Sequence, residues 1–389
     1  MNMFSPKAGA CLALLGGLGF AAGSQAAGTI AIGDGLTVSI GGGLRAGYGS
    51  TEDATSSGDN SNNFSLQSAR LYLSGAAAES VKFTFNTECK GCVFGSNDAA
   101  GSGGDIDVLD AIAQFELSPG FNVWVGRMLT PADRIEMNGP YYGLSWNQYT
   151  VPLLPSDQTG QAGLLGRDDG VTVWGATGKF QYAVGLFDGV DGGPNSKDNP
   201  LLSARLAYNF LTMESNPGYY TSSTYFGGAG DIFTVGLVYQ QQSDGVGTAA
   251  LPSDFSAEIV DVLWENALSG GGAFTVEAEY KILDAEVAPL AATDPTCFCM
   301  FDGDAYFVTV AYLFGGDNTV RWQPYVRYTS NEPDSLTTPE SDLSEFGLNM
   351  IIKGHNARMN VNWTTGDANL TGAPGTDADS FSFGVQIQI

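Results

Sequence analysis

Apolar residues recur at every second position in many segments of about ten residues, and this alternation constrains the fold more than any other feature. In the final segment Phe381, Phe383, Val385 and Ile387 share one parity, while polar residues and glycine occupy the other. A period of two places successive side chains on opposite faces of a β-strand. The pattern therefore predicts an all-β chain whose strands each have one apolar face.

The alternating segments number about 16, and the gaps between them are mostly long and short in turn. The predicted strands lie near 36–48, 63–74, 80–88, 106–117, 121–129, 168–176, 179–187, 201–210, 231–241, 256–267, 273–284, 304–314, 319–329, 343–353, 357–366 and 378–389. Long loops at one end and tight turns at the other are typical of outer-membrane barrels. One connection breaks the pattern, because residues 211–230 are long where a short turn is due.

These observations predict a transmembrane antiparallel β-barrel of about 16 strands in the outer membrane of a Gram-negative bacterium. A barrel of this size leaves an aqueous lumen. Only 15% of the residues are charged, whereas soluble domains carry about 25%; a wall that faces lipid accounts for the difference. No segment after residue 26 approaches the 18 continuous apolar residues of a membrane-spanning helix.

The first 26 residues are predicted to be a signal peptide, which leaves residues 27–389 as the barrel domain. Lys7 precedes an apolar run from Ala8 to Gly23, and small residues at Ser24 and Ala26 provide a cleavage site. The formal net charge of the chain is −26, and no acid is lost with the leader. Such a negative surface repels nucleic acid and excludes it as a partner. We expect contacts with outer-membrane lipid and lipopolysaccharide instead.

Several motifs in the first half of the chain resemble the phosphate-selective porin O and P family. They are ARLYL at 69–73, GRMLTPADR at 126–134, GRDDGV at 166–171 and VGLFDG at 184–189. The resemblance implies a homotrimeric barrel of 16 strands with a long loop, here residues 130–167, folded into the channel. Family members that take up phosphate line the pore with basic residues, especially lysines. The present chain departs from this, because residues 135–165 contain no Lys or Arg.

If the apolar parity faces lipid, the opposite parity faces the lumen and includes nine basic residues. These candidate pore-lining and solute-binding residues are Arg45, Arg70, Lys82, Arg205, Lys281, Arg321, Arg327, Lys353 and Arg358. Basic side chains that face lipid cost about 2–4 kcal/mol at the bilayer midplane, which alone favours the lumen. The alternative is an arginine strip that orients anionic or polar solutes. The acids Asp110, Glu116, Glu277, Glu279 and Glu345 share this parity, and they predict only modest ion selectivity.

Candidate constriction residues in the long loop are Asp133, Arg134 and Glu136, although Asp133 and Arg134 could equally form a local ion pair. After removal of the leader, four cysteines remain in two long loops: Cys89, Cys92, Cys297 and Cys299. An even number in an oxidising compartment favours disulfides, with three possible connectivities. Metal binding by four thiolates is the alternative. We predict no metal site and no cofactor.

The sequence offers little for catalysis. The one histidine, His355, lies in a tight Gly-His-Asn turn, so a Ser-His-Asp centre would have to use that turn. We therefore expect a porin, not an enzyme, that passes small hydrophilic solutes or inorganic ions, including anions, by passive diffusion. The alternatives are a barrel that anchors acidic loops as a surface structural or adhesive protein, and an outer-membrane enzyme.

Overall fold

The computed structural model of the protein describes residues 28–33, 36–90, 105–158, 166–214, 219–316, 319–335 and 337–389. These residues form strands β1 to β17 and two short helices. In chain order the elements are β1 (Gly28–Gly33), β2 (Leu36–Thr51), β3 (Ser61–Ala78), β4 (Val81–Lys90), β5 (Asp105–Ser118), β6 (Phe121–Leu129), α1 (Arg134–Tyr142), α2 (Pro155–Gln158), β7 (Arg167–Thr177), β8 (Phe180–Phe187), β9 (Leu201–Asn209), β10 (Ile232–Gly247), β11 (Pro252–Ala267), β12 (Ala273–Asp284), β13 (Gly303–Leu313), β14 (Arg321–Pro333), β15 (Ser341–Lys353), β16 (Ala357–Gly366) and β17 (Ser380–Gln388). The predicted leader, residues 1–26, lies outside the described residues.

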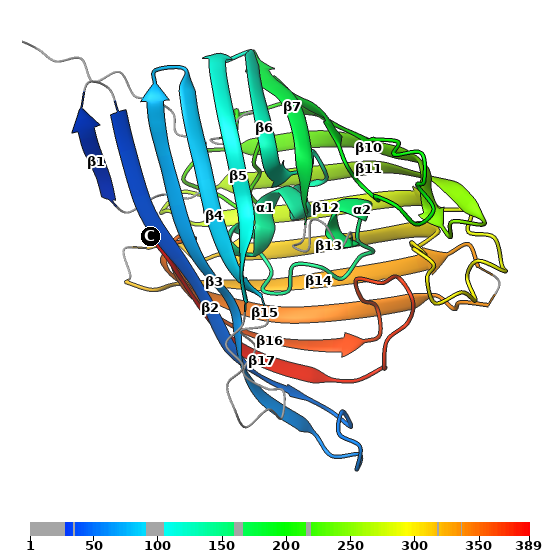
Figure 1. The fold of residues 1–389 in the computed structure, drawn as a ribbon. Helices are drawn as coiled ribbons and strands as arrows, with labels where there is room; N and C mark the ends of the chain where they lie inside the picture. Colours follow the sequence, from blue (N-terminus) through cyan, green and yellow to red (C-terminus); the bar gives the residue numbers. More distant parts are fainter. Residues whose placement is uncertain are drawn as a thin grey trace, which may run out of the picture.

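Strands β2 to β17 form a closed antiparallel barrel, which confirms the predicted fold class (Figure 1). Each strand pairs with the next, and β17 closes the ring against β2 with Phe383 opposite Tyr48. Strand β1 was not predicted. It pairs with the first part of β2, just beyond the point where Gly42 and Ile389 exchange backbone hydrogen bonds of 3.0 and 2.9 Å.

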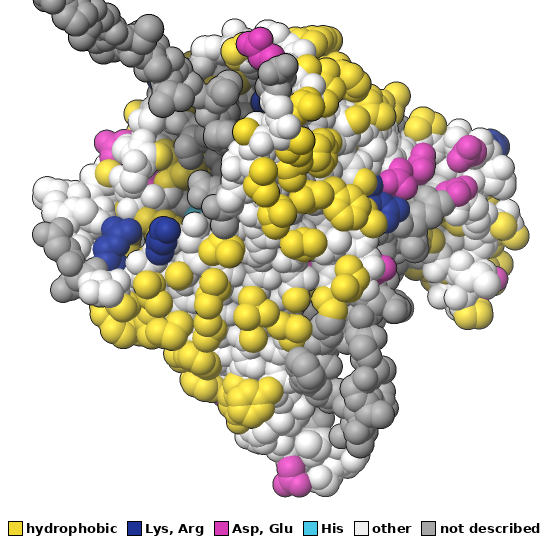
Figure 2. All heavy atoms as spheres, turned by 60° about the vertical axis from the view of Figure 1, so that its left-hand side comes forward, with side chains coloured by type: hydrophobic (Ala, Val, Ile, Leu, Met, Phe, Trp, Pro, Cys, Tyr) yellow, Lys and Arg dark blue, Asp and Glu magenta, His cyan; other side chains and the backbone are white. Residues whose placement is uncertain are grey.

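The alternation predicted from the sequence separates the two faces of the wall. In β12, Glu277 and Lys281 point inward and are buried, whereas Tyr280 and Ile282 on the other parity are exposed on the outside. Figure 2 shows one outer face of the barrel, where hydrophobic side chains spread over the wall and most visible acids lie toward its ends. In the described part of the chain, no helix has the length and apolarity to span a bilayer.

The described part of the loop between β6 and β7, residues 130–158 and 166, folds into the barrel as predicted and is called the infolded loop below. Both α1 and α2 belong to it and lie inside the ring of strands (Figure 1). The Asp133 side chain caps α1 by accepting a 3.0 Å hydrogen bond from the backbone N–H of Glu136. At the kink in α1, Gly139 has a φ of 58°, a conformation that glycine adopts without strain.

A second segment also folds inward, from the opposite end of the barrel. It lies between β9 and β10, comprises the described residues 210–214 and 219–231, and is called the β9–β10 segment. Tyr219, Ser223 and Thr224 of this segment are buried. This explains why the connection after β9 is long where the alternation of long and short connections predicted a short turn. The connection occupies part of the lumen instead of turning outside it.

Candidate pore constriction

Basic side chains of the barrel wall bind main-chain carbonyl groups of the infolded loop. The donor and acceptor pairs are Arg45 with Trp146 (2.8 Å), Arg358 with Gly143 (2.6 Å), Arg327 with Asn147 (2.8 Å), Arg205 with Ala132 (3.1 Å) and Lys281 with Pro152 (3.3 Å). Buried carbonyls need donors, and arginine supplies five N–H groups in a fixed geometry. These five predicted pore-lining cations therefore lie inside the barrel and anchor the loop.

Packing supports the same docking. The Arg45 guanidinium lies 4.0 Å from the centre of the Trp146 ring, within the range of a cation–π contact. Gly384 of β17 faces that ring, and any Cβ there would clash with it. Ile135 of the loop forms a buried cluster with Phe307 of β13. The loop thus fills part of the lumen.

Within the described residues, the other four predicted pore-lining cations form no hydrogen bond with the infolded loop. Arg70 forms an ion pair of 2.5 Å with Glu88, and Lys82 pairs with Glu116. Arg321 donates to the backbone carbonyl of Gly271, at the short-turn end. Lys353 is exposed at the end of β15.

The predicted constriction residues lie between the loop and the wall, fully buried, and do not face open water. Asp133 and Glu136 surround Lys281, whose Nζ is 2.8 Å and 3.3 Å from their carboxylates. Arg134 pairs with Glu214 at 2.7 Å and approaches Asp261 at 3.4 Å. In these contacts Asp133 and Arg134 pair with other residues and do not form the local ion pair that was the alternative.

Docking of the infolded loop is expected to weaken as the pH rises. Burial raises the pKa of Glu136 well above its usual range, and the carboxylates of Asp157 and Asp133 add to the rise. In the released loop Glu136 would be in water and would lose its proton at the ordinary glutamate pKa. Above that pKa the docked loop therefore binds more protons than the released loop, and docking loses stability as the pH rises. We expect open-channel current noise to grow from acidic to alkaline pH, and Glu136→Gln to flatten this dependence. Glu52→Gln, in an exposed loop, should behave like wild type; an equal response in both variants contradicts the prediction.

The β9–β10 segment holds α1 from the short-turn end of the barrel. The Thr221 hydroxyl lies 2.8 Å from both the Arg134 carbonyl and the side-chain oxygen of Asn138, and these two acceptors share its one proton. Glu214 binds the Arg134 guanidinium through both carboxylate oxygens. The two infolded segments therefore form one hydrogen-bonded unit inside the barrel.

His355 lies in the predicted tight turn and also contacts this unit. Its ring packs between Tyr142 and Phe226, with ring centres 5.0 and 4.7 Å away. Nε2 lies 2.9 Å from the Thr224 carbonyl, which requires Nε2 to carry the proton. Nε2 therefore cannot accept a proton from Ser222, whose hydroxyl is 3.1 Å away. Burial, followed by the charge of Arg358, lowers the pKa of His355 to about 3 and keeps the ring neutral.

Two of the cavities among the described residues lie beside the infolded segments. The larger, with about 490 Å³ of empty space that includes open solvent, lies between α1 and the wall, where Arg70, Asn86, Asp110 and Arg167 line it. The smaller, about 300 Å³, is lined by residues of β8 and β9 and of the β9–β10 segment. Both are bordered by Tyr220 and Thr221. Their position identifies a candidate constriction on the side of the lumen that the loop leaves unfilled.

Most residues of this constriction were missed from the sequence. Tyr72 of β3 and Asn86 of β4 share the inward parity of Arg70 and Lys82, and an inward tyrosine in a predicted water-filled barrel is a usable signal. Gly43 of β2 makes room for this tyrosine, since a Cβ there would lie 2.6 Å from its hydroxyl. Tyr220 belongs to the connection that broke the rhythm. Its inward position had no other signal in the sequence.

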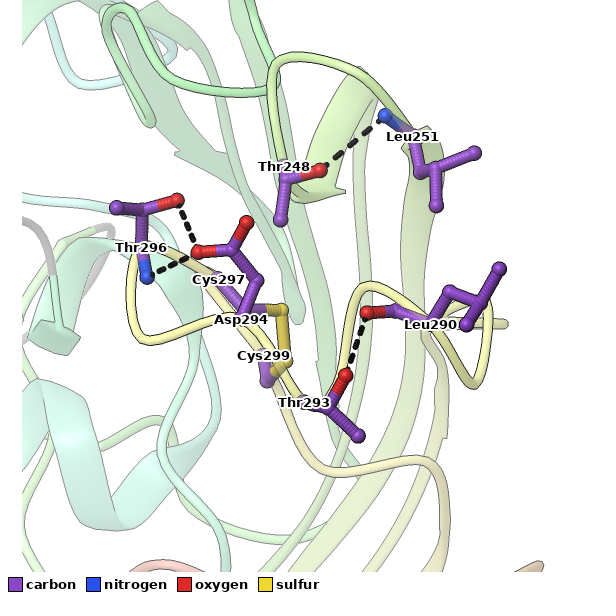
Figure 3. Close-up of a disulfide and its surroundings, with 8 residues drawn as sticks. All are labelled: Thr248, Leu251, Leu290, Thr293, Asp294, Thr296, Cys297 and Cys299. Atoms are coloured by element: carbon purple, nitrogen blue, oxygen red, sulfur yellow. Dashed lines mark hydrogen bonds between the residues drawn. A yellow bond between two sulfur atoms is a disulfide. The ribbon is translucent and has the colours of Figure 1, made fainter.

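The structure joins Cys297 to Cys299 in the loop between β12 and β13 (Figure 3). Between these cysteines, Phe298 exchanges backbone hydrogen bonds of 3.0 and 2.9 Å with Gly247 at the end of β10. Cys89 is also disulfide-bonded, and Cys92 lies outside the described residues. With its sulfurs in a disulfide, the 297–299 pair offers no thiolate to a metal.

Comparison with protein families gives one match: residues 38–217, just under half of the chain, fit the model of phosphate-selective porin O and P. No curated protein matches the sequence. The barrel is similar to that of the anion-selective porin from Comamonas acidovorans, with a TM-score of 0.58, 11% identity, and coverage of 91% of this chain and 100% of that one.

Two further solved structures share the architecture. Outer-membrane expressed OmpT of Vibrio cholerae has a TM-score of 0.56 at 15% identity, covering 92% of this chain and all of its own. Salmonella typhi OmpF, solved in complex with daunomycin, has a TM-score of 0.57 at 12% identity, covering 93% of this chain and all of its own. At these identities the likeness establishes the fold alone.

Proposed function

We propose that this outer-membrane porin, which matches the phosphate-selective porin O and P family over residues 38–217, passes small hydrophilic solutes by passive diffusion and discriminates little between anions and cations. The route runs through the candidate constriction between α1 and the wall. The charge pairing of the lumen is the observation that carries this proposal.

Most inward-facing guanidinium groups are already bound by acceptors of the protein. At the constriction Arg70 pairs with Glu88, and Arg167 lies 3.3 Å from Asp110. Arg205 pairs with Asp261 on the far side of α1. A transported anion would have to compete with these carboxylates for the positive charge. Paired charges across a narrow passage orient dipolar solutes without strongly selecting net charge.

The expected reversal potential in a potassium chloride gradient is therefore close to zero. Potassium and chloride diffuse at similar rates, so a potential near zero reports weak selectivity. The exposed acids of the outer loops, such as Glu52 and Asp59, also oppose any preference for anions. Single channels of the purified protein in planar bilayers provide the measurement. A potential near the limit for a purely anion-selective pore, in chloride or in phosphate, contradicts the proposal.

The same recordings separate the channel from the alternative of a barrel that only anchors acidic surface loops. Steady openings support the channel, whereas a folded barrel that conducts no current supports the anchor. We propose no catalytic activity. The Ser222–His355 contact is a poor starting point for hydrolysis, because Ser222 is buried and His355 Nδ1 has no carboxylate partner among the described residues.

We further propose that the leader, residues 1–26, is cleaved on export and that the mature barrel is a homotrimer in contact with lipopolysaccharide. An in-vitro folded OmpT of Vibrio cholerae, similar in fold, was solved in a trimer form. The apolar outer wall supports burial in lipid or against a neighbouring copy. Crosslinking of the protein in outer-membrane fractions tests the assembly, and mass analysis of its N-terminus tests the cleavage.

A further inference from the structure

The larger cavity combines hydrogen-bond donors, one free acceptor and aromatic surface, without an uncompensated charge. Besides the four polar residues named above, it is lined by the tyrosines Tyr72, Tyr141, Tyr142 and Tyr220. A solute that uses the constriction must pass these groups.

The free acceptor is the side-chain carbonyl of Asn86. The Asn86 amide group donates a 2.8 Å hydrogen bond to Asp110, which fixes the orientation of the side chain because a carboxylate only accepts. Asn86 Oδ1 is buried and has no hydrogen-bond partner among the described residues. A buried acceptor without a donor is costly, so a solute hydroxyl at this position would be stabilised.

The donors come from Arg70. Its Nε binds Glu88, and within the described residues the structure gives its two terminal nitrogens no hydrogen-bond acceptor. The guanidinium lies 5.1 Å from the centre of the Tyr141 ring. The ion pair therefore neutralises Arg70 but leaves N–H groups beside the cavity.

We propose that this cavity binds a neutral polyhydroxylated solute, a sugar or a polyol, during its passage through the channel. A hydroxyl group both donates and accepts, so one molecule can satisfy Asn86 and Arg70 together. Tyr142 and Tyr220 are only partly buried and offer ring surface to the C–H faces of a sugar. The inference rests on the proposed function, since the solute must reach the cavity through the channel.

An inorganic anion fits the same groups poorly. It would place negative charge beside Asp110 and Asn86 Oδ1, both of which are acceptors. It would also have to draw Arg70 and Arg167 away from the carboxylates that already bind them. Breaking such pairs inside a protein is unfavourable unless the anion replaces every contact.

Current block in planar bilayers tests the proposal. Glucose is added to full-length protein that conducts in potassium chloride, with triethylene glycol and sodium phosphate as comparison solutes. Triethylene glycol has chiefly ether oxygens and controls for viscosity and for filling of the pore. We expect glucose to reduce the current more than triethylene glycol or phosphate does. Asn86→Leu should raise the half-blocking glucose concentration about fivefold to tenfold, as expected for the loss of one hydrogen bond.

Asn362→Leu is the matched control, because Asn362 is a buried inward asparagine of β16 that does not line the cavity. Its glucose block should equal that of wild type. If Asn86→Leu does not insert into bilayers, Tyr220→Leu removes one aromatic ring from the cavity lining and should also weaken the block. Three results in a conducting channel would overturn the inference and leave the channel function standing. They are a glucose block equal to that of triethylene glycol, a phosphate block stronger than that of glucose, or an equal response of the two asparagine variants. Absence of conductance instead overturns the proposed function, and the inference with it.

Discussion

Lys281→Met is expected to release the infolded loop and to raise the single-channel conductance several-fold. Lys281 is fully buried, and its Nζ lies 2.8 Å from Asp133, 3.3 Å from Glu136 and 3.6 Å from Glu279. Removing it leaves three carboxyl groups without their shared cation. Loss of one partner from a buried ion pair costs about 3–5 kcal/mol. This cost exceeds the contribution of any single hydrogen bond that docks the loop.

The barrel itself should persist in this variant, because the ladders between neighbouring strands do not depend on Lys281. Heat-modifiable migration in gels checks that the barrel is folded, and bilayer recordings measure the conductance. Arg321→Met is the matched control: it removes one cation whose only described hydrogen bond is to the Gly271 carbonyl at a turn. A folded Lys281→Met barrel with wild-type conductance and noise would show that the loop docks without this lysine.

Tyr220→Ala is expected to join the two cavities and to admit larger solutes. Tyr220 borders both spaces, of about 490 and 300 Å³. Its ring packs against Tyr219 and Trp124, with centres 5.2 and 5.9 Å away. Truncation to a methyl group removes a ring that borders both spaces, whereas Tyr219 still packs against Trp124 at 4.6 Å. The β9–β10 segment should therefore stay in place while the passage widens.

Liposome swelling with sugars of increasing size measures the change in size limit, and bilayer conductance measures the change in width. Tyr306→Ala, which removes a tyrosine from the outer wall beside Tyr328, is the matched control and should leave both unchanged. If Tyr220→Ala keeps the wild-type size limit, the narrowest point of the route lies elsewhere. Comparison of Tyr220→Ala with Lys281→Met shows how far the β9–β10 segment and the infolded loop each narrow the channel.

The strand pattern could be predicted from local sequence because backbone geometry produces it. Side chains alternate along any strand, and lipid accepts only apolar ones, so the parity of Phe381, Phe383 and Ile387 determines the outer face. Several predicted bounds agree with the structure to the residue, as for β6 (Phe121–Leu129) and β16 (Ala357–Gly366). Strand β1 was missed because its six residues, GTIAIG, are too few to establish an alternation.

The candidate site depends on contacts between residues that are far apart in the chain. Arg358 binds the carbonyl of Gly143, 215 residues away, and Arg327 binds that of Asn147, 180 residues away. The position of both arginines in the alternation correctly places their side chains inside the barrel. It carries no information about which segments fill the lumen. Asp133 and Arg134 are adjacent in the sequence, yet their charge partners are Lys281 and Glu214.

By itself, then, the alternation in the sequence determined that this chain closes a sheet in a membrane and which residues face lipid, and the resemblance to the porin family implied that a long loop enters the lumen. The tertiary structure alone decided whether an inward side chain meets water or another segment of the chain. The physical reason is that alternation is a local property of one strand, whereas burial inside the barrel depends on the infolded loop and the β9–β10 segment meeting there. The β9–β10 segment was visible in the sequence only as a break in the rhythm, and Tyr220 at its centre now borders both cavities of the candidate route.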